Sequence, residues 1–346
     1  TTGEFSFILR QGKWTALSHP ILTAKAIPSM LRSMQSKERA RAVDMAIFDH
    51  PDYAAAKNAK LHLVDENAKL SRQEELFMGR LAHSMPVVSH LNRGARVYLN
   101  KLRFDTWQAM RKSMSKSGTP TPVEDAQIAM FVNESTGRGG LGKSGEPAAV
   151  LLGRTLFAPR YLMSRLQLGT GHSMWGGTAR SRTVIAKEYA RSLVGLGLYY
   201  TMLKAYFGDD NNKGNVETDP RSADFGKVRL GNTRLDPLSG MAQMITFISR
   251  TASGQTKTTK GKVLPIRGEK LKFGTDKWTD VAARFGRSKL HPVPASIANL
   301  FDGTDLSGTK TDLLSEAGGM AAPITYVDIY KALREQDVDD GVALVL

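Results

Sequence analysis

The sequence predicts a mainly α-helical fold with long amphipathic helices and one small β-hairpin near residues 227–236. Two long proline-free stretches, residues 87–116 and 178–207, are the strongest indications of helix. Residues 228–235 supply strand-forming side chains on either side of a Gly-Asn pair, which is typical of a tight hairpin turn. A hydrophobic content of 41% is enough to form a core, but it is not that of a membrane protein.

Local signals place helices in the first third of the chain. Ser71 and Glu74 have the spacing of a capping box, and the helix that they begin ends at Pro86. Apolar residues then recur at helical spacing, so we expect one long amphipathic helix over residues 87–116. A Ser-Gly-Thr-Pro sequence at residues 117–120 ends this helix.

Similar signals organise the middle of the chain. Thr121 and Glu124 form a second capping-box pattern with a proline in the first turn, which predicts a helix to about residue 133. A glycine-rich loop follows over residues 137–145, and short helices come after it. The second long helix is predicted over residues 178–207.

The last third of the chain predicts shorter elements. Residues 238–251 are helical and apolar, whereas residues 252–274 are rich in Lys, Thr and Gly. The latter composition predicts a flexible basic connection or a long exposed loop. Short helices are expected over residues 275–290 and 292–301, and a final helix over residues 323–334.

We expect three regions within a longer parent polypeptide. The first, residues 1–118, holds the first long helix, and the second, residues 119–207, holds the glycine loop and the second long helix. The third, residues 208–346, contains an acidic loop, the hairpin and the C-terminal helices. The chain starts at Thr1 without a methionine and stops in an apolar run, so we interpret both ends as cuts.

Positive charge is concentrated in two predicted helical regions, residues 91–118 and 137–204. The chain has 48 Lys and Arg against 33 Asp and Glu, which gives a net charge of +15. Such regions favour contact with the phosphates of nucleic acid or of lipid headgroups, although a basic face balanced by an acidic partner subunit would look the same. The residues predicted to bind nucleic acid are Arg93, Arg96, Lys101, Arg103, Arg111, Lys112, Arg138 and Lys143.

The glycine loop matches the pattern of a phosphate-binding loop. Four residues separate Gly137 from Gly142, which is followed by Lys143 and Ser144. In a nucleotide hydrolase this loop follows a buried strand, but here the preceding segment is expected to be helical. An NTPase is therefore the least favoured interpretation, and contact of Arg138 and Lys143 with DNA phosphate is preferred.

No catalytic or metal-binding pattern stands out, so the chain is predicted not to be an enzyme and to need no metal or cofactor. The seven histidines are scattered without metal-ligand spacing, and the chain has no cysteine, which excludes disulfides and thiolate chemistry. The acidic residues that follow the second long helix do not have the spacing of an EF-hand. Capping and turn formation explain them more simply.

An uncharged segment between Arg191 and Lys204 is the candidate for membrane contact. Its twelve residues are too few for a transmembrane helix, which needs about 20 apolar residues. A buried core helix is the favoured interpretation, and an interfacial or conditionally inserted helix is the alternative. The residues predicted to contact a membrane in that alternative are Leu193, Leu196, Leu198, Tyr199, Tyr200 and Leu203.

The stretch DPRSADFGKVRLGNTRLDP at residues 219–237 carries a family resemblance. Together with segments in the same order elsewhere, it resembles the large polyvalent protein-associated domains of phage, which occur in very large internal virion proteins that take part in DNA ejection. The other segments span nearly the whole chain: residues 1–12, 99–105, 133–142, 157–165 and 285–292.

The resemblance implies a structural internal virion protein of a bacteriophage, packaged in the capsid and taking part in genome ejection. Implied partners are other copies or other internal virion proteins, the portal, viral DNA and the host envelope membrane. The implied locations are the virion interior and, after ejection, the host envelope or periplasm. The rival interpretations are a packaging or carrier module of an injected phage enzyme and the P-loop NTPase.

Overall fold

The chain folds into two compact units, which are described here one at a time. The first comprises Thr1–Val150 and Ala158–Leu198, and the second comprises Leu151–Phe157 and Tyr199–Leu346. The boundary expected after residue 118 lies within the first unit. The computed structural model describes residues 11–64, 86–142, 156, 158–207, 216–230, 233–238, 240–258, 261–267, 277–290, 292–302 and 310.

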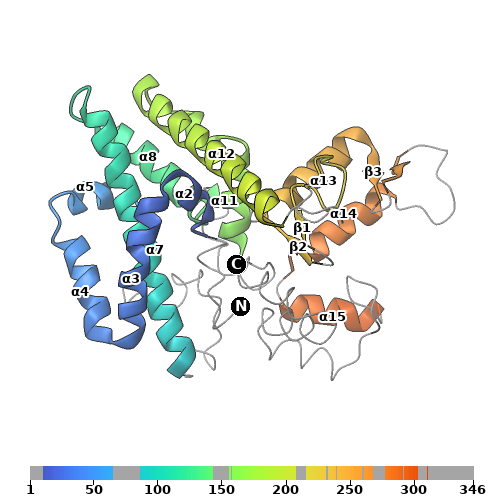
Figure 1. Cartoon of the computed structure of the whole chain (residues 1–346), viewed down its shortest axis with the longest axis horizontal. Coiled ribbons are helices and arrows are strands. Elements are labelled where there is room, and N and C mark those ends of the chain that lie inside the picture. Colours follow the sequence, from blue (N-terminus) through green and yellow to red (C-terminus); the bar gives the residue numbers. More distant parts are fainter. Residues whose placement is uncertain are drawn as a thin grey trace. The chain divides into compact units, whose positions relative to one another are not determined.

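Helices build the described part of the first unit, as the sequence predicts (Figure 1). The long helix α7 and the capped helix α8 lie where they were expected. The last helix, α12, begins in this unit and continues into the second. The elements are α2 (Lys13–Ser18), α3 (Pro20–Gln35), α4 (Lys37–Phe48), α5 (Tyr53–Asn58), α7 (Pro86–Ser115), α8 (Pro122–Ser135), α11 (Pro159–Gly169), the 3₁₀ turn η3 (His172–Met174) and α12 (Ala179–Phe207).

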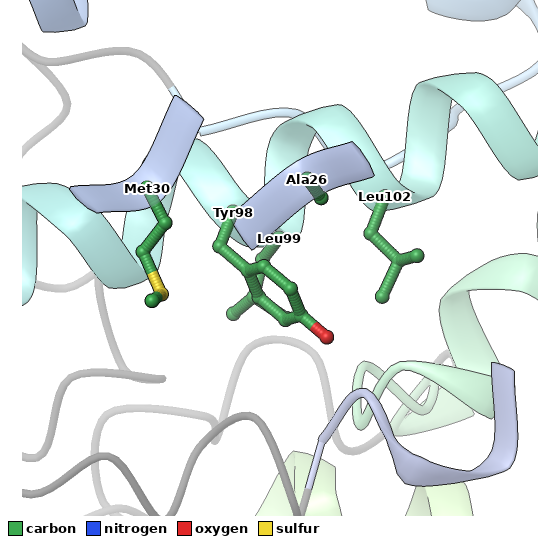
Figure 2. Packing of buried hydrophobic residues seen from close by; sticks show 5 residues of the cluster. All are labelled: Ala26, Met30, Tyr98, Leu99 and Leu102. Carbon is green, nitrogen blue, oxygen red and sulfur yellow. The ribbon is translucent and has the colours of Figure 1, made fainter. Parts of the chain in front are cut away.

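Packing of α3 along α7 forms a hydrophobic cluster in this unit (Figure 1). Ala26 and Met30 of α3 meet Tyr98, Leu99 and Leu102 of α7, and all five are at most 2% exposed (Figure 2). The α7 residues are one and three positions apart, so they lie on one side of the helix. The apolar stripe that predicted α7 is therefore the stripe that packs against α3.

The predicted capping box begins α8. The Thr121 hydroxyl accepts a hydrogen bond from the Glu124 amide at 3.4 Å, and the Glu124 carboxylate accepts one from the Thr121 amide at 2.9 Å. The two bonds satisfy amides that a helix leaves without partners in its first turn.

A close approach of α12 to α2 explains one of the two glycines in the uncharged segment of α12. A Cβ atom at Gly195 would lie 2.2 Å from the Leu17 carbonyl oxygen, so only glycine fits there. A Cβ atom at Gly197 would meet nothing within 4 Å. The close packing of α12 on α2 therefore depends on Gly195.

The described part of the second unit contains the predicted hairpin and three more helices. Strands β1 and β2 pair antiparallel, with Val228 opposite Leu235 and Leu230 opposite Thr233. The helix predicted before Pro86 and the helix predicted over residues 323–334 lie outside the described residues. The elements are β1 (Val228–Leu230), β2 (Thr233–Leu235), α13 (Met241–Ser253), β3 (Gln255–Lys257), β4 (Val263–Pro265), α14 (Trp278–Arg287) and α15 (Pro292–Asp302).

A second two-stranded sheet, formed by β3 and β4, corrects the expectation of a loop over residues 252–274. Thr256 pairs with Leu264, and Lys257 pairs with Val263. The Lys257 amide also donates to the Arg221 carbonyl at 3.2 Å, which ties β3 to the turn before β1. These pairs, together with the long-range bond to Arg221, stabilise a segment whose composition alone predicts an irregular loop.

Candidate functional site

Two arginines at the centre of the predicted nucleic-acid site on α7 form their contacts within the first unit itself. Arg96 is 6% exposed and forms an ion pair with Asp44 of α4. Arg103 is fully buried, where its Nε donates to the Thr136 hydroxyl at 2.8 Å and its Nη1 donates to the His62 carbonyl at 3.3 Å. Neither side chain reaches the surface, so the prediction that Arg96 and Arg103 face DNA is wrong for the folded chain.

The other cations of α7 lie nearer to the surface. Arg93 donates to the carbonyls of Ser33 and Met34, both at 2.5 Å, and so caps the C-terminal end of α3. Lys101 pairs with an aspartate one turn away on the same helix, at 2.9 Å. Lys112 is exposed. Only the edge of the predicted cluster is therefore available for contact with a polyanion.

Arg111, a further member of the predicted cluster, links three elements. Its Nε donates to both oxygens of Asp125 on α8, at 3.0 and 3.2 Å, and its Nη1 donates to Asp52 at 2.5 Å. Its guanidinium also lies 5.4 Å from the centre of the Trp107 ring. Burial raises the pKa of Asp125, and the Arg111 hydrogen bond opposes that rise. Arg111 therefore has a structural role in this unit.

The candidate membrane segment is buried on one side and exposed on the other. Leu193 and Leu198 are 58% and 62% exposed. Leu196, Tyr199, Tyr200 and Leu203 are half-buried. In the second unit, Tyr200 and Leu203 pack against the buried Val228 of the hairpin. The favoured interpretation of this segment as a buried core helix is therefore wrong, because its covered side is only half-buried.

Among the described residues, no helix combines the length and the apolar character that crossing a membrane requires.

The glycine loop begins as the C-terminal cap of a helix. The Gly137 amide donates to the Glu134 carbonyl at 3.3 Å, and the Arg138 amide donates to the Asn133 carbonyl at 2.7 Å. With Gly137 at a φ of +85°, this is the Schellman arrangement. The segment before the loop is thus helix α8, as expected, and not the strand that precedes a phosphate-binding loop. Lys143 and Ser144 lie outside the described residues.

A cavity of about 860 Å³ opens beside this loop within the first unit. Its walls come from the end of α5, one face of α8, the glycine loop, α11 and η3. The charged and titratable groups on its wall include Lys60, Glu134, Arg138, Arg160 and His172. The cavity brings Arg138, a predicted site residue, together with residues that the sequence did not single out.

A buried carboxylate of the cavity wall is hydrogen-bonded to a histidine of the same wall. Glu134 is 1% exposed, and its Oε1 lies 2.6 Å from Nδ1 of His172. Burial raises the pKa of Glu134, while the hydrogen bond from His172 opposes the rise. The His172 ring packs edge-on against Trp175 with centres 5.3 Å apart. Glu134 therefore holds the imidazole by one nitrogen, and the other nitrogen lies on the far side of the ring.

Sequence reasoning missed this pair because no local pattern joins its members. Glu134 and His172 are separated by 38 residues, and His172 stands on a three-residue turn between α11 and α12. Asn-Glu-Ser at the end of α8 resembles any polar helix terminus. Among the described residues, no group of three or more histidines and carboxylates has the arrangement of a metal site.

Comparison with known proteins adds no relative. No model of a protein family matches the chain, and no curated protein or solved structure shows significant similarity to it. The α7 cations, the uncharged segment of α12 and the cavity are therefore interpreted from their own geometry and chemistry.

Proposed function

We propose that the chain is a structural segment of a bacteriophage internal virion protein, packaged with the genome and taking part in its ejection. The observation that carries the proposal concerns the segment 219–237, which supplies the strongest resemblance to that family. Its charged side chains bind one another and neighbouring strands, which is the behaviour of residues that build a fold. A catalytic motif would instead direct such groups toward a cavity.

Asp219 and Arg221 illustrate this use of the motif. Arg221 donates from Nε and Nη2 to the two oxygens of Asp219, at 3.0 and 2.9 Å. The Arg221 guanidinium thereby lowers the pKa of Asp219 to about 2. Arg221 Nη1 also donates to the Gln255 side chain of β3 at 2.5 Å, and Asp224 accepts a hydrogen bond from Arg234 Nε of β2 at 3.4 Å. The motif thus holds the first hairpin, the turn before it and the second sheet together.

A direct test is the composition of phage particles. Peptides of this chain should be found by mass spectrometry in purified, DNA-filled virions of the phage that encodes it. They should be depleted from particles that have ejected their DNA, because an ejected protein leaves with or before the genome. Detection only in infected cells, and not in purified virions, would reject the proposal.

DNA contact in the proposed role is assigned to the α3–α4 surface, which we define as Arg32, Lys37, Arg39 and Arg41. All four side chains are exposed. Glu38 is the acidic residue among them, and its pKa is lowered by Ser36 first and by nearby arginines to a smaller extent. These exposed cations lie at the join of two helices, where phosphates can reach them, unlike the buried Arg96 and Arg103 of α7.

Replacing three residues of this surface, Lys37, Arg39 and Arg41, by glutamine should weaken DNA binding and leave the fold intact. The slope of log affinity against log salt should fall by roughly 0.9 for each lost phosphate contact. Fluorescence anisotropy with duplexes of unrelated sequence at several salt concentrations measures both effects.

A matched control removes three exposed cations elsewhere in the first unit, at Lys57, Arg182 and Lys187. This variant should keep most of the affinity and of the salt slope. Equal losses in the two variants would show that attraction is spread over the whole surface. That result, or the absence of DNA binding by the unmodified chain, would contradict the assignment to the α3–α4 surface.

A further inference from the structure

The cavity of the first unit has an excess of positive charge. Among the described residues of its wall, Lys60, Arg138 and Arg160 are the cations and Glu134 is the carboxylate. That carboxylate already accepts a hydrogen bond from His172 at 2.6 Å. The balance favours a ligand that carries more than one negative charge.

Backbone contacts fix the loop that carries Arg138 against the helix that carries Arg160. The Gly139 amide donates to the Arg160 carbonyl at 3.1 Å, and Gln167 Nε2 donates to the Gly140 carbonyl at 2.9 Å. A Cβ atom at Gly139 would lie 2.3 Å from the Ser164 amide nitrogen, so the loop and α11 are in direct contact. The backbones of Arg138 and Arg160 are therefore held near each other before any ligand binds.

The rest of the wall suits an uncharged organic group. Val123, Ala126 and Met130 recur three and four positions apart on α8, which places them on one face of the helix. Val123 is 60% exposed. An apolar wall beside a cationic end is the usual arrangement of a site for a small molecule with an anionic group.

We propose that this cavity binds a phosphomonoester attached to a small organic group, such as a nucleoside. Arg138 and Arg160 would hold the phosphate, because guanidinium groups match its charge and its oxygen geometry. Glu134 holds the His172 ring through Nδ1, and Nε2 lies on the opposite side of that ring. This ligand site goes beyond the structural role proposed above and does not depend on it.

Isothermal titration calorimetry of the whole chain tests the proposal. The probes are inorganic phosphate, a nucleoside 5′-monophosphate and the same nucleoside without phosphate. The two phosphates should bind saturably at one site, and the nucleoside alone should bind at least about tenfold more weakly than its monophosphate. A folded chain that binds neither phosphate saturably would overturn the site.

Variants locate the binding. Arg138→Gln combined with Arg160→Gln should raise the Kd of the monophosphate about tenfold or more. Lys112→Gln combined with Arg182→Gln removes the same charge outside the cavity and should change the Kd by less than about twofold. Equal weakening in both pairs would show non-specific attraction and reject the site.

A second variant keeps the test valid if the arginine pair disturbs folding. Val123→Glu adds a carboxylate to an exposed position of the wall and removes no polar contact, so it should weaken monophosphate binding while circular dichroism stays unchanged. Unchanged affinity in that folded variant would count against the site.

The source of the ligand is resolved by comparing 5′-phosphorylated and 5′-hydroxyl oligonucleotides. Preference for the phosphorylated strand indicates a DNA end, and equal affinity beside retained monophosphate binding indicates a free small molecule.

Discussion

Replacing Arg96 by alanine is expected to lower the free energy of unfolding of the first unit by about 3–5 kcal/mol. The substitution leaves Asp44, 4% exposed, without its ion-pair partner. Asn100 donates to the other Asp44 oxygen at 3.4 Å, which is too weak a contact to replace a guanidinium. Urea denaturation followed by circular dichroism measures the change.

Two further variants separate this effect from a general loss of charge. Lys112→Ala on the exposed side of the same helix should change the free energy of unfolding by less than about 0.5 kcal/mol. Arg96→Met combined with Asp44→Leu removes both charges and should recover most of the loss. A cost below about 1 kcal/mol for Arg96→Ala would show that the pair is not a stabilising element. The same reasoning means that charge reversal at Arg96 or Arg103 would reduce DNA binding through unfolding.

Glu124→Gln is expected to be the second most damaging change, at about 2–4 kcal/mol, because charge-assisted hydrogen bonds contribute about 1.5–3 kcal/mol each. Glu124 is 3% exposed and binds Arg180 through both Nε, at 2.9 Å, and Nη2. Thr178 donates its hydroxyl to the same carboxylate at 2.6 Å, and Thr121 completes the capping box. Thermal and urea unfolding at neutral pH measure the loss.

The pH dependence of that loss identifies its cause. Hydrogen bonds from Arg180 are the largest influence on the pKa of Glu124 and hold it far below its ordinary value. A carboxyl group whose folded pKa is depressed stabilises the fold above its unfolded pKa, about 4.3, and loses that contribution as pH falls toward its folded pKa. The difference in stability between the unmodified chain and Glu124→Gln should therefore be constant above about pH 5 and narrow below about pH 4.

An exposed acid in the first turn of another helix supplies the control. Glu38→Gln on α4 should cost far less stability than Glu124→Gln, since interactions of exposed charges with a helix terminus are weak. If the two glutamine variants behave alike, or if the Glu124 difference persists unchanged to pH 2, the assigned role of Arg180 is wrong.

The elements that the sequence predicted well are those with local signals. Helix α7 was marked by an apolar stripe, α8 by Thr121 and Glu124, and the first hairpin by a Gly-Asn turn between strand residues. Strands β3 and β4 were missed because their stability comes from pairing with each other and with Arg221, which composition does not reveal.

The partners of charged residues were not predictable from local spacing. Arg96 finds Asp44, which is 52 residues away in the chain, and Arg103 finds backbone and hydroxyl groups rather than a surface. A run of arginines on a helix reads as a basic surface, because sequence shows charge but not the fold around it. The same limit concealed Glu134 and His172, which only the packing of α8, α11 and η3 brings together.

Because the Arg96–Asp44 pair is buried, salt weakens this ion pair of the first unit very little. Mobile ions screen exposed charges within about 10 Å at 0.1 M salt, but they reach a pair in the interior far less. In the proposed role, attraction between the α3–α4 surface and DNA would weaken as salt rises, whereas the contacts that join α4 to α7 would persist. A change of medium would then release the DNA while the first unit keeps its fold.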